Sequence, residues 1–172
     1  MLAMAQELAR TDPLTGTWSD TGMTMFQGRF WAGYTASNTN AYAVGGTRNA
    51  TNFASLSTAE TFTPAGGWTQ LATIPPTAAG RLAPGLAIKS GNLDVFGGAK
   101  GNTGIGFTLW NSTYGCTLPT CTSWSDQSLN LVTARRFYGL ASGKTKTLPF
   151  TMVAAGGGGA GGVTLASAER QP

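Results

Sequence analysis

The chain has 172 residues, of which 10% are charged and none is histidine, and its 11 basic and 7 acidic residues give a net charge of +4. Without histidine, a Ser-His-Asp or Cys-His catalytic site within the chain is excluded, and two cysteines are too few for an ordinary structural zinc site. The basic residues are scattered and form no stripe interleaved with aromatic residues, so we expect no binding to nucleic acid.

No other group of residues points to catalysis or to a cofactor. Asp20 and Asp126 each follow a tryptophan by two residues, which indicates equivalent positions in a repeat rather than the facing carboxylates of a glycosidase. The glycine-rich run 154–162 lacks the Gly-Lys-Ser/Thr ending of a phosphate-binding loop. The uncharged stretch 147–168 is too polar and too rich in glycine for a membrane span. We therefore expect a protein that is not an enzyme and that holds no cofactor or metal.

Short runs of β-branched and aromatic residues, separated by Gly, Pro, Asn and Thr, predict an all-β chain. The turns 37–40 and 89–92 carry the polar residues that a hairpin needs between two such runs. In chain order, the expected strands are 30–36, 41–44, 57–62, 68–71, 83–88, 93–96, 106–110, 124–128, 137–141, 151–155 and a last one from about Val163 to the C-terminus.

Several landmarks recur in one order along the chain, with a period near ~50 residues that is typical of repeat architectures. Tryptophans open the units, at Trp18, Trp68 and Trp124. An arginine follows each tryptophan after 11 to 13 residues, for which we take Arg29, Arg81 and Arg136. Each arginine precedes an apolar segment that ends in a glycine pair: Gly45-Gly46, Gly97-Gly98 and Gly156-Gly157. An Ala-Glu strand comes next in two units, at Glu60 and Glu169, and residues 107–111 take its place in the middle unit.

This order of tryptophan, arginine, glycine pair and Ala-Glu strand resembles the kelch repeat of β-propellers, over almost the whole chain from about residue 7 to 172. The resemblance implies four-stranded antiparallel blades around a central channel, of which about 4–8 close a ring. It also implies packing and pairing roles for the tryptophans, arginines, glycine pairs and glutamates. We expect one partial propeller over 1–172, in which 7–17 end a preceding blade, 18–67 and 68–123 form two repeats, and 124–172 form a truncated third.

Cys116 and Cys121 are spaced too widely for a C-x-x-C redox motif, so we expect a disulfide that closes an enlarged hairpin tip. Asn49 and Asn111 begin N-glycosylation sequons and are candidate glycan sites. Together with a surface rich in hydroxyls and amides, these features favour an extracellular, cell-surface or organelle-lumenal location.

Trp31 and Trp110 fall outside the repeat position, and we expect them to fill gaps between blades rather than to bind a ligand. Function in such folds lies in loops, here 47–54 and 99–103 on one face and the hairpin turns on the other. The main hypothesis is a non-catalytic interaction or scaffold module, a subunit of a larger assembly, that binds a protein partner or further blades of its own propeller.

Two alternatives remain open. The first is a carbohydrate-binding propeller, or the propeller part of a secreted enzyme whose active site lies outside this chain. The second is a half-propeller that pairs with a second copy to close six blades. A ring of three blades would leave edge strands exposed at both ends, so completion by a longer protein or by a partner is expected in every case.

Overall fold

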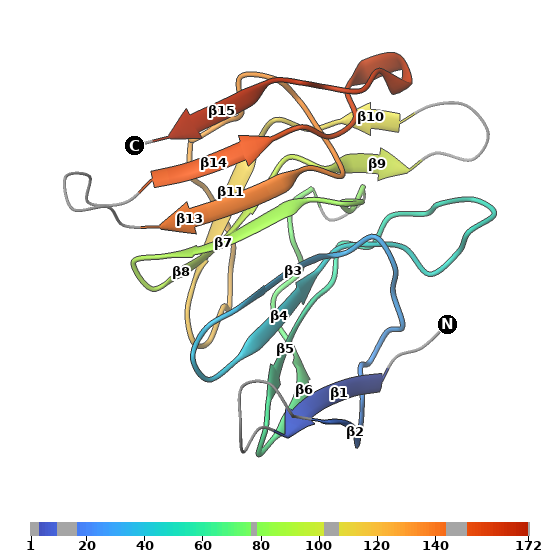
Figure 1. The fold of residues 1–172 in the computed structure, drawn as a ribbon, viewed down its shortest axis with the longest axis vertical. Helices are drawn as coiled ribbons and strands as arrows, with labels where there is room; N and C mark the ends of the chain where they lie inside the picture. The colour runs from blue at the N-terminus through green and yellow to red at the C-terminus, as the bar shows by residue number, and fades with distance from the viewer. Residues whose placement is uncertain (1–3, 10–16, 77–78, 102–106, 144–150, 172) are drawn as a thin grey trace.

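The computed structural model describes residues 4–9, 17–76, 79–101, 107–143 and 151–171, and it confirms the predicted all-β chain (Figure 1). Sheet I contains β3 (Gly33–Ala36), β4 (Ala41–Val44), β5 (Ala59–Thr63) and β6 (Gly67–Gln70). Sheet II contains β7 (Gly85–Lys89), β8 (Asn92–Phe96), β11 (Thr113–Thr117) and β12 (Ser125–Asp126). Sheet III contains β13 (Gly139–Gly143), β14 (Thr151–Ala155) and β15 (Ala168–Gln171).

Two smaller strand pairs and a short 3-10 helix complete the described part. The strands β1 (Met4–Ala9) and β2 (Thr17–Thr24) pair with each other, as do β9 (Ala99–Gly101) and β10 (Phe107–Leu109). The 3-10 helix η1 (Ala160–Gly162) follows the third glycine pair. All strand pairs are antiparallel, and none of the described sheets closes on itself. Residues 10–16, which belong to the segment 7–17 expected to end a preceding blade, lie outside the described residues.

The three sheets lie side by side, with their first strands adjacent: β3 contacts β7, and β7 contacts β13 (Figure 1). The hairpin turns after β3 and β7 lie on the left of the view, and the described segments that follow the glycine pairs, including β9 and η1, lie on the right. The two sets of loops therefore lie on opposite sides of the stack. At the N-terminal end, β2 lies against β6 of sheet I.

The hydrophobic core forms two layers because the middle sheet is covered on both faces. In β8, Leu93 and Val95 belong to the layer shared with sheet I, whereas Phe96 belongs to the layer shared with sheet III. Successive side chains of a strand point to opposite faces, so β8 is buried from Leu93 to Phe96, and this run includes the carboxylate of Asp94. Tyr42 from sheet I and Met152 from sheet III complete the two layers.

The expected third strand of the middle unit is wrong. Residues 107–109 pair with β9 in a small extension, and β11 is the strand that pairs with β8. The sequence signal failed because the β9–β10 insertion itself has strand-like composition, and because Tyr114 stands in β11 where the other units have glutamate.

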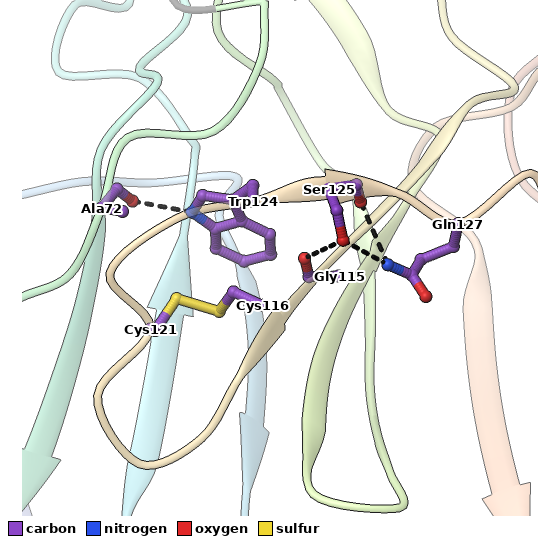
Figure 2. The surroundings of a disulfide bond; sticks show 7 residues. All are labelled: Ala72, Gly115, Cys116, Cys121, Trp124, Ser125 and Gln127. Atoms are coloured by element: carbon purple, nitrogen blue, oxygen red, sulfur yellow. Dashed lines mark hydrogen bonds between the residues drawn. A yellow bond between two sulfur atoms is a disulfide. The ribbon is translucent and has the colours of Figure 1, made fainter.

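The sulfur atoms of Cys116 and Cys121 lie at bonding distance, with a Cα–Cα distance of 5.0 Å. The bond joins the end of β11 to the loop before β12, at the enlarged turn that the sequence indicated (Figure 2). Both cysteines are buried and belong to the core between sheets I and II. Among the described residues, no helix is long and apolar enough to cross a bilayer.

Candidate binding surface

Each of the three sheets contains one buried arginine that hydrogen-bonds to its backbone. In sheet III this residue is Arg135, not the predicted Arg136. Each donates two hydrogen bonds from one guanidinium nitrogen: one to the carbonyl of the first glycine of its pair, and one to a carbonyl before the third strand. The acceptors are Gly45 and Thr58 for Arg29, Gly97 and Ser112 for Arg81, and Gly156 and Ser167 for Arg135. The spacing held a signal, since Arg135 follows Trp124 by 11 residues, as Arg29 follows Trp18.

The two repeat glutamates neutralise two of these arginines. Glu60 pairs with Arg29, and both side chains are fully buried. It also accepts the backbone N–H groups of Phe26 and Gln27. Because these partners satisfy the carboxylate, Glu60 serves the interior of sheet I and is not available to a ligand.

Glu169 repeats this arrangement in sheet III. It pairs with Arg135 and accepts the N–H groups of Val132 and Thr133. Although burial opposes ionisation, the hydrogen bonds from these three residues lower the pKa of Glu169 below its usual value.

In sheet II, the aromatic ring of Tyr114 stands where the other sheets have a carboxylate. The Arg81 guanidinium carbon lies 5.2 Å from the ring centroid of Tyr114 and 5.9 Å from that of Trp110, so cation–π contacts replace the ion pair. Burial lowers the pKa of Arg81 to about 10. Trp110 therefore contacts buried Arg81 inside the protein.

The repeat tryptophans lie on or next to the outer strands. Trp18 in β2 is opposite Leu8, and Trp68 in β6 is opposite Phe62. Trp124 directly precedes β12, and its indole N–H donates to the Ala72 carbonyl at 2.8 Å (Figure 2). Trp31 behaves differently, because 38% of it remains exposed.

Trp31 belongs to a set of equivalent positions, two residues after each repeat arginine, that includes Ala83 and Phe137. All three adopt the left-handed conformation, with φ of 54°, 46° and 53°. The Ala83 N–H donates to the Trp31 carbonyl at 2.6 Å, and the Phe137 N–H donates to the Ala83 carbonyl at 3.2 Å. Ala83 shows that a methyl group suffices here, yet two strained positions carry large aromatic side chains. Strain of this kind concentrates at functional sites.

Trp31 and Phe137 are the exposed part of an aromatic cluster that also contains Phe53 and Phe107. The Trp31 ring stacks on Phe53 with centroids 5.0 Å apart and an interplanar angle of 10°. Its edge contacts Phe137 at 5.0 Å, and Phe53 lies 6.2 Å from Phe107. Phe137 is 45% exposed. The cluster joins residues next to all three sheets, so it exists only once the sheets have stacked.

The surroundings of the aromatic cluster are basic. The Arg136 guanidinium carbon lies 3.5 Å from the Phe107 ring centroid. Its buried Nε has no hydrogen-bond partner among the described residues, and burial lowers its pKa. The loops after the glycine pairs add Arg48 and Lys100, and the sequence has no acidic residue over 45–56, 97–112 or 156–167.

A hollow of about 230 Å³ runs along the first strands of the three sheets. Tyr34 and Tyr138 are its titratable lining residues. The Tyr138 hydroxyl accepts the Gly85 N–H at 3.2 Å and donates to the Phe96 carbonyl at 2.7 Å. Both hydrogen bonds stabilise the fold, so this hydroxyl is not available to a ligand. Burial raises the pKa of Tyr34.

Both sequon asparagines, Asn49 and Asn111, are exposed. Asn49 lies in the loop after the first glycine pair, where its side-chain oxygen accepts the Thr51 N–H at 2.7 Å. Their glycosylation remains a prediction.

Asp94 provides a pH-dependent contribution to stability. It is 3% exposed, its Oδ1 accepts no hydrogen bond from the described residues, and burial raises its pKa from 3.8 to about 6, against a smaller opposing effect of Lys89. The folded state therefore binds this proton more tightly than the unfolded chain, and stability falls as the pH rises from about 4 through 6.

We expect Asp94→Asn to remove this fall. Relative to the wild type, the free energy of unfolding of the variant should rise by about 1–3 kcal/mol between pH 4 and pH 8. Urea denaturation across this range measures the difference. Parallel pH profiles for the two proteins would contradict the assignment.

No protein-family model and no curated protein matches the chain. In structure, 111 solved chains match it. The solved structure of YjhT matches with a TM-score of 0.76 at 15% sequence identity. The match covers 98% of this chain and 48% of the YjhT chain, so this chain spans about half the length of that protein. At this identity the likeness establishes a shared fold and carries no information about activity.

Proposed function

We propose that the chain is a non-catalytic segment of a kelch-type β-propeller that binds a protein partner through the aromatic cluster. Sheets I, II and III would be consecutive blades, and their stacking through adjacent first strands supports this assignment. The observation that carries the proposal is the exposure of Trp31 and Phe137 on the side of the stack that carries the glycine-pair loops.

The chemistry of this surface favours a partner with acidic groups. Exposed tryptophan and arginine are the residue types that dominate binding energy in protein interfaces. Arg48, Lys100 and Arg136 supply positive charge around the aromatic cluster, which would steer an acidic partner toward it. The disulfide supports an oxidising compartment such as the cell exterior or an organelle lumen.

A peptide display library that spans neutral to acidic sequences tests the proposal. Selected binders should be acidic, should lose affinity with added salt, and should bind the Trp31→Ala variant at least about tenfold more weakly. Tyr34→Ala is the control, since Tyr34 is an aromatic residue on β3 that lies outside the aromatic cluster and is more exposed than Trp31, 58% against 38%. Binders that are indifferent to Trp31→Ala would overturn the proposal.

A carbohydrate ligand is the second candidate, because an exposed indole offers a flat apolar face to a sugar ring. One face of the Trp31 ring stacks on Phe53, which fixes the orientation of the indole. A glycan array with the wild type and Trp31→Ala separates the two candidates. Sugar binding that disappears in the variant would support this candidate over a protein partner.

A further inference from the structure

A cavity of about 250 Å³ lies between sheets II and III. Its apolar lining comes from both sheets and from the segment that joins them, and includes Phe96, Leu131, Leu140, Met152 and Ala154. Glu169 and Arg170 of β15 also line it. In the described residues, β15 is the last strand of sheet III and has one edge without a neighbouring strand.

The equivalent space between sheets I and II is occupied by Trp124. The N–H of Ile74, before sheet II, donates to the Ser57 carbonyl of sheet I. The N–H of Leu131, before sheet III, donates to the Asn111 carbonyl of sheet II, so Leu131 and Ile74 occupy equivalent positions. Trp124 packs against the core layer that contains Ile74. The cavity therefore lies at the position that corresponds to the site of Trp124 between sheets I and II.

The same backbone hydrogen bonds join sheet I to sheet II and sheet II to sheet III, so the two outer sheets present complementary donor and acceptor groups. The second glycine of each pair donates to the repeat arginine carbonyl of the next sheet, Gly46 to Arg81 at 2.7 Å and Gly98 to Arg135 at 2.8 Å. A second set of hydrogen bonds between the sheets runs from the Ala83 N–H to the Trp31 carbonyl and from the Phe137 N–H to the Ala83 carbonyl, as described above. At the sheet I end the matching groups are the Arg29 carbonyl and the Trp31 N–H, and at the sheet III end they are the Gly157 N–H and the Phe137 carbonyl. Among the described residues, none of these four groups makes a hydrogen bond.

The first glycine of the third pair also lies open. A Cβ at Gly45 would overlap the Arg81 carbonyl oxygen, and a Cβ at Gly97 would lie 2.9 Å from the Arg135 carbonyl oxygen. A Cβ at Gly156 would meet only the Leu165 carbonyl oxygen, at an ordinary 3.7 Å. The space beside Gly156 is therefore open among the described residues, whereas an arginine carbonyl of the next sheet fills the equivalent space beside Gly45 and Gly97.

The chain itself carries a strand suited to the cavity. Trp18-Ser19-Asp20 in β2 repeats the tripeptide Trp124-Ser125-Asp126 that fills the equivalent seat, and β2 leads directly to sheet I. We propose that two copies of this chain associate head to tail, with sheet I of each copy packed on sheet III of the other and with Trp18 of each copy in the cavity of the other. In this pair β2 lies beside β15 of the second copy, in place of β1.

The pairing rests on the propeller stacking proposed above and is independent of what the aromatic cluster binds. A closed pair would contain six four-stranded sheets. It would also match the length of the YjhT fold, of which one copy covers 48%.

Sedimentation equilibrium of the full chain at about 1 to 100 µM tests the pairing. We expect a mass twice that of one chain, and a dissociation constant at least about tenfold higher for Trp18→Ala and for Gly156→Ala. Gly161→Ala is the matched control for Gly156→Ala, because both glycines have φ near the same left-handed value and a Cβ at Gly161 meets nothing within 4 Å. Circular dichroism establishes that each variant remains folded.

A wild type that stays monomeric throughout this range would overturn the pairing and leave the Trp31 binding test unaffected. A dimer that Trp18→Ala and Gly156→Ala do not weaken would overturn it as well, because the contact would then lie elsewhere. If Trp18→Ala fails to fold, Gly156→Ala decides alone, since its substitution lies at the opposite end of the chain.

Discussion

Replacing Glu60 by glutamine should lower the free energy of unfolding by about 3–5 kcal/mol, the usual effect of removing one partner of a buried ion pair. The variant retains the shape of the side chain but leaves the Arg29 guanidinium without a counter-ion. Both side chains are 0% exposed, so water cannot compensate for the loss. Urea denaturation at pH 7 measures the change.

The third sheet supplies a matched control for this prediction. Glu169 makes the same set of contacts with Arg135, but its side chain is 16% exposed. Glu169→Gln should therefore lower the free energy of unfolding by less, about 1–2 kcal/mol. Equal losses in the two variants, or a loss below about 1 kcal/mol for Glu60→Gln, would show that the surrounding hydrogen bonds and not the ion pair stabilise the sheet.

Gly45→Ala should destabilise the protein by about 3–5 kcal/mol, through left-handed strain and through steric overlap. Gly45 has φ of +69°, and an added Cβ would overlap the carbonyl oxygen of Arg81 in the next sheet. The same carbonyl accepts the Gly46 N–H, so relieving the overlap would separate sheets I and II and break their hydrogen bond. Thermal and urea unfolding of the variant measure the loss.

Gly91→Ala separates the two contributions. Gly91 has φ of +80° and a Cβ there would meet nothing within 4 Å, so this variant carries the conformational strain without the overlap. We expect a loss of about 1–2 kcal/mol. If Gly45→Ala were no worse than Gly91→Ala, the close approach of the two sheets would contribute nothing to stability.

The local features of this protein could be predicted because they depend on neighbouring residues. The alternation of β-branched runs with turn residues predicted an all-β chain, and the polar segments 37–40 and 89–92 are the hairpin turns of sheets I and II. The spacing of Cys116 and Cys121 placed their bond at an enlarged turn. The tertiary structure was needed where two local patterns competed, as between Arg135 and its neighbour Arg136.

The sequence by itself thus determined that the chain forms short antiparallel strands in a repeated order, since turn chemistry and strand composition act over a few residues. Only the tertiary structure decided which arginine enters the core and that the ring of Tyr114 replaces a carboxylate. The aromatic cluster of Trp31, Phe53, Phe107 and Phe137 also arises only from stacking, because its members come from segments up to about a hundred residues apart and meet when three sheets pack together.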